Sequence, residues 1–162
     1  CMMTGIPNVN RIYLLYRAVT LVFLLCLGIY DAKHHLIRNA ALFSFCCWCL
    51  LSIPAKYFCG INISLSSLVF AAILGAVCGF FLFLAIAVAT DSGIGGGDIK
   101  LVTLLGFYYG ASGLYLVLIS SCIMVLFVIL LCRILFRSKP KSIPFAPFLF
   151  LGCLFYEILS LF

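Results

Sequence analysis

Carboxylate side chains are the first candidates for chemistry in this chain, because only four occur among its 162 residues. They are Asp31, Asp91, Asp98 and Glu157. Each lies in or beside a long apolar stretch, where an ionisable group costs free energy and often serves a function. Two carboxylates that share a water molecule are able to hydrolyse a peptide bond, one as general base and one as general acid. A pair of these residues is therefore the first candidate site.

Asp98 follows a glycine-rich stretch that reads Gly93-Ile94-Gly95-Gly96-Gly97-Asp98. Glycine has no Cβ, so such a loop lets an extended substrate backbone approach the carboxylate closely. The plainer alternative is a flexible loop whose aspartate caps the following helix. Lys100 is either a neighbour of the carboxylates or a basic anchor at the membrane surface. We predict a substrate-binding loop that comprises Gly95, Gly96, Gly97 and Lys100.

The elements that must position these groups are predicted from hydrophobic runs and the residues that break them. Six helices are expected, at about 12–30, 39–53, 65–90, 98–109, from the break at 110–113 to 135, and 145–162. The second is expected to stop near Pro54. Asp31 directly follows the first helix and Asp98 begins the fourth. Arg17 is expected to extend toward the nearer surface, and Glu157 to pair with another helix or lie near the outer surface.

Composition places these helices in a bilayer. Hydrophobic residues make up 67% of the chain and charged residues 9%, against roughly 45–50% and 25% in soluble domains. Mean hydropathy is +1.35. We predict an all-α polytopic membrane protein, a bundle of about six transmembrane helices that forms a single membrane-embedded domain over residues 1–162. The net charge of +6 is then explained by lipid headgroups as partners and not by nucleic acid.

The basic residues predict the orientation, since cytoplasmic loops are enriched in Lys and Arg. With six helices the loops alternate between the two sides of the membrane. One side receives Lys33, Arg38, Lys100, Arg133, Arg137, Lys139 and Lys141, and the other Arg11, Arg17 and Lys56. The first side is predicted to be cytoplasmic, with both termini outside. Asp31 and Asp98 then lie at the same, cytoplasmic face.

Cysteine usage predicts no metal site. Of the ten cysteines, Cys46 and Cys49 have the Cys-x-x-Cys spacing of a zinc ligand pair, but a structural zinc site needs four ligands and no second pair follows. Cysteine as a small apolar residue in a helix is the better interpretation. We expect no cofactor.

Three segments together resemble the prepilin peptidases, also called type IV leader peptidases, which are Gly-x-Gly-Asp intramembrane aspartic proteases. Gly95-Gly96-Gly97-Asp98-Ile99-Lys100-Leu101 is similar to the family signature. The stretch from Asp31 to Asn39 resembles the segment around the first aspartate, with Arg38 where proline is expected. Ile143-Pro144-Phe145-Ala146-Pro147-Phe148-Leu149 resembles the Pro-Phe-x-Pro-Phe entry to the last helix.

This resemblance implies a catalytic pair of Asp31 and Asp98 that activates water without a metal. It implies a type IV pilin-like precursor as substrate, with a short basic leader in the cytoplasm followed by an apolar helix. The expected location is the prokaryotic cytoplasmic (inner) membrane, with the active site facing the cytoplasm. Longer relatives carry two Cys-x-x-Cys pairs in a segment associated with N-methylation. This chain is therefore expected to be a short form without the zinc and methyltransferase segment.

Other interpretations remain open at this stage. A small transporter or channel would use two intramembrane acids as a proton or cation site, with the glycine loop as a broken-helix ion site. A presenilin-like protease would share the chemistry but would not explain the Pro-Phe-Ala-Pro-Phe segment. A catalytically silent relative would serve as an assembly factor, although both aspartates are present.

Overall fold

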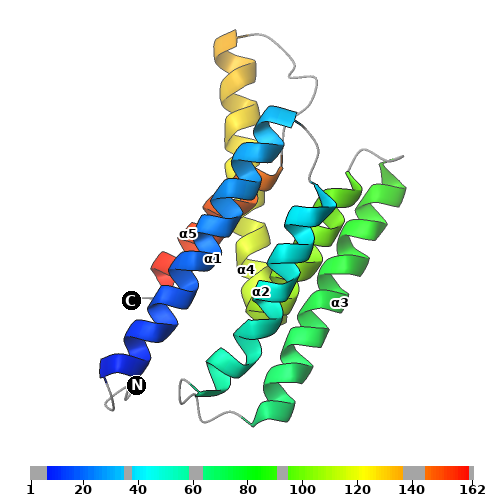
Figure 1. Ribbon diagram of the computed structural model, residues 1–162. Helices are drawn as coiled ribbons and strands as arrows, with labels where there is room; N and C mark the ends of the chain where they lie inside the picture. Colours follow the sequence, from blue (N-terminus) through cyan, green and yellow to red (C-terminus); the bar gives the residue numbers. More distant parts are fainter. Residues whose placement is uncertain (1–6, 35–37, 59–63, 91–94, 137–144, 161–162) are drawn as a thin grey trace.

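The described part of the chain contains five helical elements in a computed structural model, and Figure 1 shows how they are arranged. The structure describes residues 7–34, 38–58, 64–90, 95–136 and 145–160. The helices are α1 (Pro7–His34), α2 (Asn39–Phe58), α3 (Leu65–Ala89), α4 (Gly96–Phe136) and α5 (Ala146–Leu159). Within these ranges there is no strand, and the predicted all-α class is confirmed.

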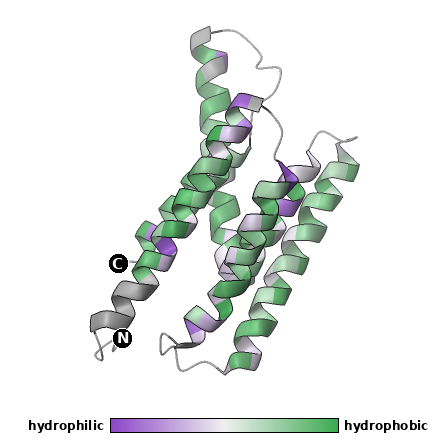
Figure 2. Cartoon of the chain, viewed as in Figure 1, coloured by the Kyte–Doolittle hydropathy of each residue, from purple (hydrophilic) through white to green (hydrophobic). Residues whose placement is uncertain are grey.

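The surface of the helices is suited to lipid. Four helices, α1 to α4, contain a stretch long and apolar enough to cross a membrane, and α5 is apolar but shorter. Large apolar side chains point outward, such as Phe43, Phe70 and Val88, which are 72%, 68% and 73% exposed. Figure 2 shows hydrophobic residues along the helix bodies. A soluble protein rarely exposes so much apolar surface, so the bundle is that of a polytopic membrane protein.

The fourth and fifth predicted helices are joined end to end in α4, so the five elements contain the predicted bundle of about six helical segments. The expected break at 110–113 is a kink within α4, where Gly110 has a φ of 73° and a ψ of 177°. This left-handed backbone conformation favours glycine. Figure 1 shows that the chain changes direction there, and the second half of α4 returns toward the end of the molecule where α4 begins.

Glycine also sets the contact between α3 and α4. A methyl group added to Gly75 would lie 2.1 Å from the carbonyl oxygen of Gly106, and one added to Gly106 would lie 2.2 Å from that of Gly75. The two backbones therefore touch directly. Small residues that allow such close approach are typical of helix contacts in membranes, where packing replaces the hydrophobic effect.

The second helix runs past the proline that was expected to end it, and α2 continues to Phe58 with Pro54 inside. Proline removes one backbone donor from a helix. In the turn before Pro54, Ser52 Oγ donates to the carbonyl oxygen of Cys49 at 2.6 Å. Membrane helices tolerate proline where neighbouring helices and side chains satisfy the freed backbone groups.

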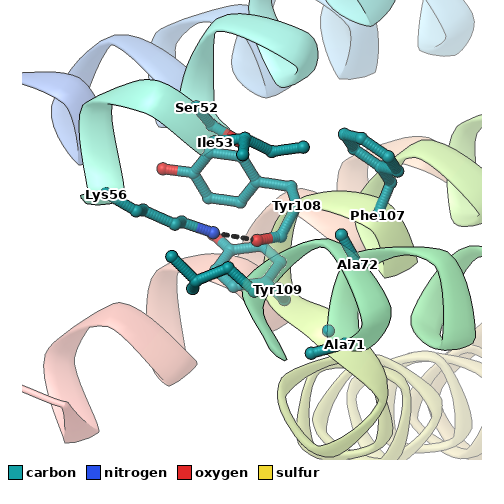
Figure 3. A pocket seen from close by; sticks show the side chains of 10 residues that line it. Ser52, Ile53, Lys56, Ala71, Ala72, Phe107, Tyr108 and Tyr109 are labelled. Atoms are coloured by element: carbon teal, nitrogen blue, oxygen red, sulfur yellow. Dashed lines mark hydrogen bonds between the residues drawn. The ribbon is translucent and has the colours of Figure 1, made fainter. Parts of the chain in front are cut away.

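The extension of α2 carries Lys56 to the kink of α4. Lys56 Nζ donates to the carbonyl oxygen of Tyr108 and lies 4.5 Å from the centre of the Tyr108 ring. Figure 3 shows this contact in a pocket of about 90 Å³ between α2, α3 and α4. A helix end leaves carbonyl groups without helical partners and carries partial negative charge. Lys56 therefore caps the first half of α4 inside the bundle.

Candidate active site

Asp31 lies in the last turns of α1 and is almost fully buried, with 6% of its surface exposed. Its Oδ2 atom accepts a hydrogen bond from the backbone N–H of Ala146, at 3.4 Å. Ala146 is the first residue of α5, so the donor is one of the backbone groups that a helix N-terminus leaves free. The N-terminal, positive end of the α5 dipole therefore faces this carboxylate.

Gly28, which was not singled out from the sequence, makes this contact between α1 and α5 possible. A methyl group at Gly28 would lie 3.1 Å from the Cα atom of Pro147 and 3.4 Å from its nitrogen. The start of α5 therefore packs directly on the α1 backbone, one turn before Asp31. In the sequence, a glycine three residues before an acidic residue in an apolar helix is the pattern that could have indicated this close helix contact.

Asp98 lies in the first turn of α4 and is half-buried. Its Oδ1 atom is buried and has no hydrogen-bond partner within the part of the chain that the structure describes. Asp98 is close enough to Asp31 for the two carboxylates to interact electrostatically. The two predicted carboxylates thus come from different helices and meet at one end of the bundle, whereas Asp91 lies outside the described residues.

Lys100 points to the beginning of α2. Its Nζ atom donates to Oδ1 of Asn39 at 3.1 Å. Asn39 belongs to the segment that resembles the family around the first aspartate, and Lys100 belongs to the segment around the second. This hydrogen bond joins the two segments, a role that neither of the two interpretations offered for Lys100 had anticipated.

Gly95 and Gly96 have few neighbours among the residues that the structure describes. Of these residues, a methyl group at Gly95 would meet only Oδ2 of Asp98, at 3.7 Å, and one at Gly96 would meet none within 4 Å. Gly95 and Gly96 are exposed and Gly97 is half-buried. Packing within the described chain therefore does not require glycine at 95 or 96.

All three segments singled out in the sequence gather at one end of the bundle. The end of α1 and the starts of α2, α4 and α5 lie toward the upper part of Figure 1. The hydrogen bonds Asp31–Ala146 and Lys100–Asn39 connect them in pairs. Within the described residues, no group of three or more His, Cys, Asp or Glu side chains is placed to bind a metal ion; the expected lack of a cofactor stays a prediction.

Glu157 belongs to a separate polar cluster. It is buried in α5, pairs with Arg17 of α1 and accepts a hydrogen bond from the hydroxyl of Tyr109 at 2.9 Å. Arg17 also contacts Ser160. The expectation that Arg17 extends toward the nearer surface stays a prediction, and its partners are the buried Glu157 and the exposed Ser160 at the end of α5. Arg17 precedes Asp31 by fourteen residues, about 21 Å along a helix.

The architecture and the carboxylate pair define a class: a helical, multi-pass membrane protein with two acidic side chains at one end. The chain matches the type IV leader peptidase family over residues 18–130, and it belongs to that family. The matched range includes Asp31, the glycine loop and Asp98. The resemblance inferred from the three segments is thereby confirmed at the level of the family, which is membrane-bound.

One curated relative is similar over part of its length. It is a prepilin leader peptidase/N-methyltransferase of Bacillus subtilis (strain 168), 34% identical over 82 residues. This match covers 48% of the present chain and 32% of the relative. The chain therefore matches about a third of that protein. No solved structure matches the chain.

Proposed function

We propose that the chain is an aspartic endopeptidase that cleaves the leader from type IV pilin-like precursors, with Asp31 and Asp98 as its catalytic residues. The observation that supports this most is that the two carboxylates interact at one end of the bundle although they come from different helices. In an otherwise apolar chain such an arrangement costs free energy and is expected to serve a function.

In the proposed mechanism the two carboxylates hold one water molecule between them. Asp31 accepts the Ala146 N–H at the start of α5, so this carboxylate is held in place as a hydrogen-bond acceptor, and we assign it the role of general base. It takes a proton as the water oxygen attacks the scissile carbonyl carbon. Asp98, whose Oδ1 is buried without a described partner, donates its proton to the carbonyl oxygen. Asp31 then gives the proton it took from water to the amide nitrogen, the C–N bond breaks and the amine leaves. Asp98 takes its proton back from the hydroxyl group as the new carboxyl group forms, so both carboxyl groups return to their starting states.

The orientation and substrate belong to the same proposal. Lys33 at the end of α1, Arg38 just before α2 and Lys100 near the start of α4 favour a cytoplasmic position for the carboxylates. The membrane would be the cytoplasmic membrane of a prokaryote, and residues 1–162 would act as one peptidase domain. A precursor with a short basic leader and a following apolar helix would then present its junction at the membrane surface, level with the carboxylates.

The direct test is cleavage of a pilin-like precursor. The purified chain is incubated in detergent or vesicles with pilin-like precursors of the same organism, and the products are weighed by mass spectrometry. The expected result is a single cut at the junction between the leader and the apolar helix, unaffected by a chelator. Precursors that remain intact under all conditions, with a folded enzyme, would contradict the proposal.

The glycine loop allows a test that separates folding from substrate binding. Because no atom of the described residues lies within 4 Å of a methyl group at Gly96, Gly96→Ala is expected to leave the free energy of unfolding unchanged or raised by less than about 1 kcal/mol. If the substrate backbone passes over this position, the same methyl group would lower kcat/KM on the order of tenfold or more. Differential scanning fluorimetry and the cleavage assay check the two parts. Full activity of Gly96→Ala would remove Gly96 from the substrate-binding loop.

A further inference from the structure

A groove lies between α1 and α2 on the membrane-embedded part of the bundle. Its volume is about 350 Å³, within the range of roughly 300–1,000 Å³ that is usual for ligand pockets. The lining residues are Phe23, Cys26, Leu27, Tyr30, Arg38, Ala41 and Ser44. All but Arg38 are apolar, aromatic or small, so an apolar occupant suits the groove.

The α1 wall leads to the first aspartate. Phe23, Leu27 and Tyr30 recur at helical spacing, so they share one side of α1. Tyr30 immediately precedes Asp31. Leu27 lies four residues before Asp31, about one helical turn away. The α1 wall of the groove therefore ends at Tyr30, one residue before the one that we assign as the general base.

The α2 wall leads to the second aspartate. It begins at Arg38, next to Asn39 at the start of α2. Asn39 accepts the hydrogen bond from Lys100, which follows Asp98 by two residues in the first turns of α4. One wall thus ends beside Asp31, and the other is tied to the helix that carries Asp98.

Aromatic side chains close the lower end of the groove. Phe23 packs against Trp48 and Phe45 of α2, with ring centres 5.9 Å and 6.1 Å apart. Trp48 in turn stacks on Tyr16 at 4.2 Å and donates to Thr20. From Phe23 to Asp31 is eight residues, or about 12 Å of helix, which corresponds to about three or four residues of extended peptide.

We propose that this groove binds the first apolar residues of the substrate that follow the scissile peptide bond. The inference rests on the proposed peptidase function and adds the place where the substrate enters. The two walls of the groove end at Tyr30 and Arg38, next along the chain to Asp31 and Asn39. A groove that ends beside these segments and spans about 12 Å suits a short peptide segment better than an acyl chain. Arg38 at its mouth repels a basic leader, so charge directs the leader away and the apolar segment inward.

Small side chains set the width of the groove and therefore what fits. Cys26 on α1 and Ser44 on α2 both line it and are exposed, so larger side chains there fill the groove without entering the core. Cys47, three residues after Ser44 on α2, is also exposed but does not line the groove. It offers a matched control for the same small-to-large change.

The kinetic test compares Ser44→Trp with Cys47→Trp. We expect Ser44→Trp to raise KM for the precursor on the order of tenfold or more while kcat changes little, because the indole competes with the substrate for space and not for the carboxylates. Cys47→Trp is expected to behave as the unmodified chain. Equal KM values for the two variants would overturn the groove proposal, and the cleavage by the parent chain would still stand.

A cross-linking test does not depend on catalysis. Benzoylphenylalanine is placed at Cys26 or, as control, at Cys47, in an Asp98→Asn background that keeps the precursor intact. Illumination is expected to join the Cys26 position to the apolar segment directly after the cleavage site, as mapped by mass spectrometry. Adducts with lipid alone, or equal capture at Cys47, would show that lipid fills the groove and would overturn the proposal.

Discussion

Replacement of Asp98 by asparagine is expected to lower cleavage of a pilin-like precursor on the order of 10⁴-fold or more, as is common when one member of a catalytic unit is lost. The amide nearly preserves the shape of the side chain but has no titratable proton, so it can neither donate to the carbonyl oxygen nor accept a proton from water. Asp31→Asn should have a similar effect. The double variant should be hardly worse than either single one, because the two carboxylates act together.

A suitable control removes a carboxylate outside the pair. Asp91 precedes the glycine-rich stretch in the sequence and lies outside the described residues. The Asp91→Asn variant is expected to keep most of the activity if Asp91 serves only to solvate or cap that loop. Initial rates are compared over several orders of magnitude of enzyme concentration, after size-exclusion chromatography shows that each variant is folded. Cleavage that persists in Asp98→Asn, or that is lost only in Asp91→Asn, would refute the assignment.

The second largest expected effect follows removal of the Glu157 carboxylate, and it concerns the stability of the fold and not the cleavage reaction. Glu157 is buried and pairs with Arg17 across the α1–α5 interface. Glu157→Leu would leave the guanidinium without its ionic partner, and breaking a buried ion pair costs about 3–5 kcal/mol. A lower midpoint of thermal unfolding in detergent, measured by tryptophan fluorescence or differential scanning fluorimetry, checks this expectation.

A double-mutant cycle measures the contribution of the Arg17–Glu157 ion pair to stability apart from that of the surrounding residues. Arg17→Leu combined with Glu157→Leu is expected to recover much of the stability lost in either single variant, because no uncompensated charge remains. Cleavage per folded molecule should stay near that of the parent chain, since Arg17 lies about 21 Å along α1 from Asp31. A Glu157→Leu variant as stable as the parent would show that the ion pair contributes little.

The sequence predicts which end of the bundle carries the site, because residue types and their order determine where the helices and loops lie. Apolar runs of membrane-spanning length indicate helices, and loops must alternate between the two sides, so counting helices is enough to bring Asp31 and Asp98 to one end. The break near Gly110 keeps this count valid, because the chain reverses there even though α4 is one element. The end of α2 was misjudged because Pro54 is tolerated inside a helix that neighbours support.

Only the tertiary structure decides which side chains meet. Alternation of loops assigns a residue to one end of the bundle, but it leaves the rotation of each helix about its axis and its depth open. Those two quantities bring the Ala146 N–H to Asp31, Asn39 to Lys100, and Lys56 to the carbonyl of Tyr108. They are determined by packing between distant segments, such as the contact of Gly28 with Pro147, which no local pattern along the chain encodes.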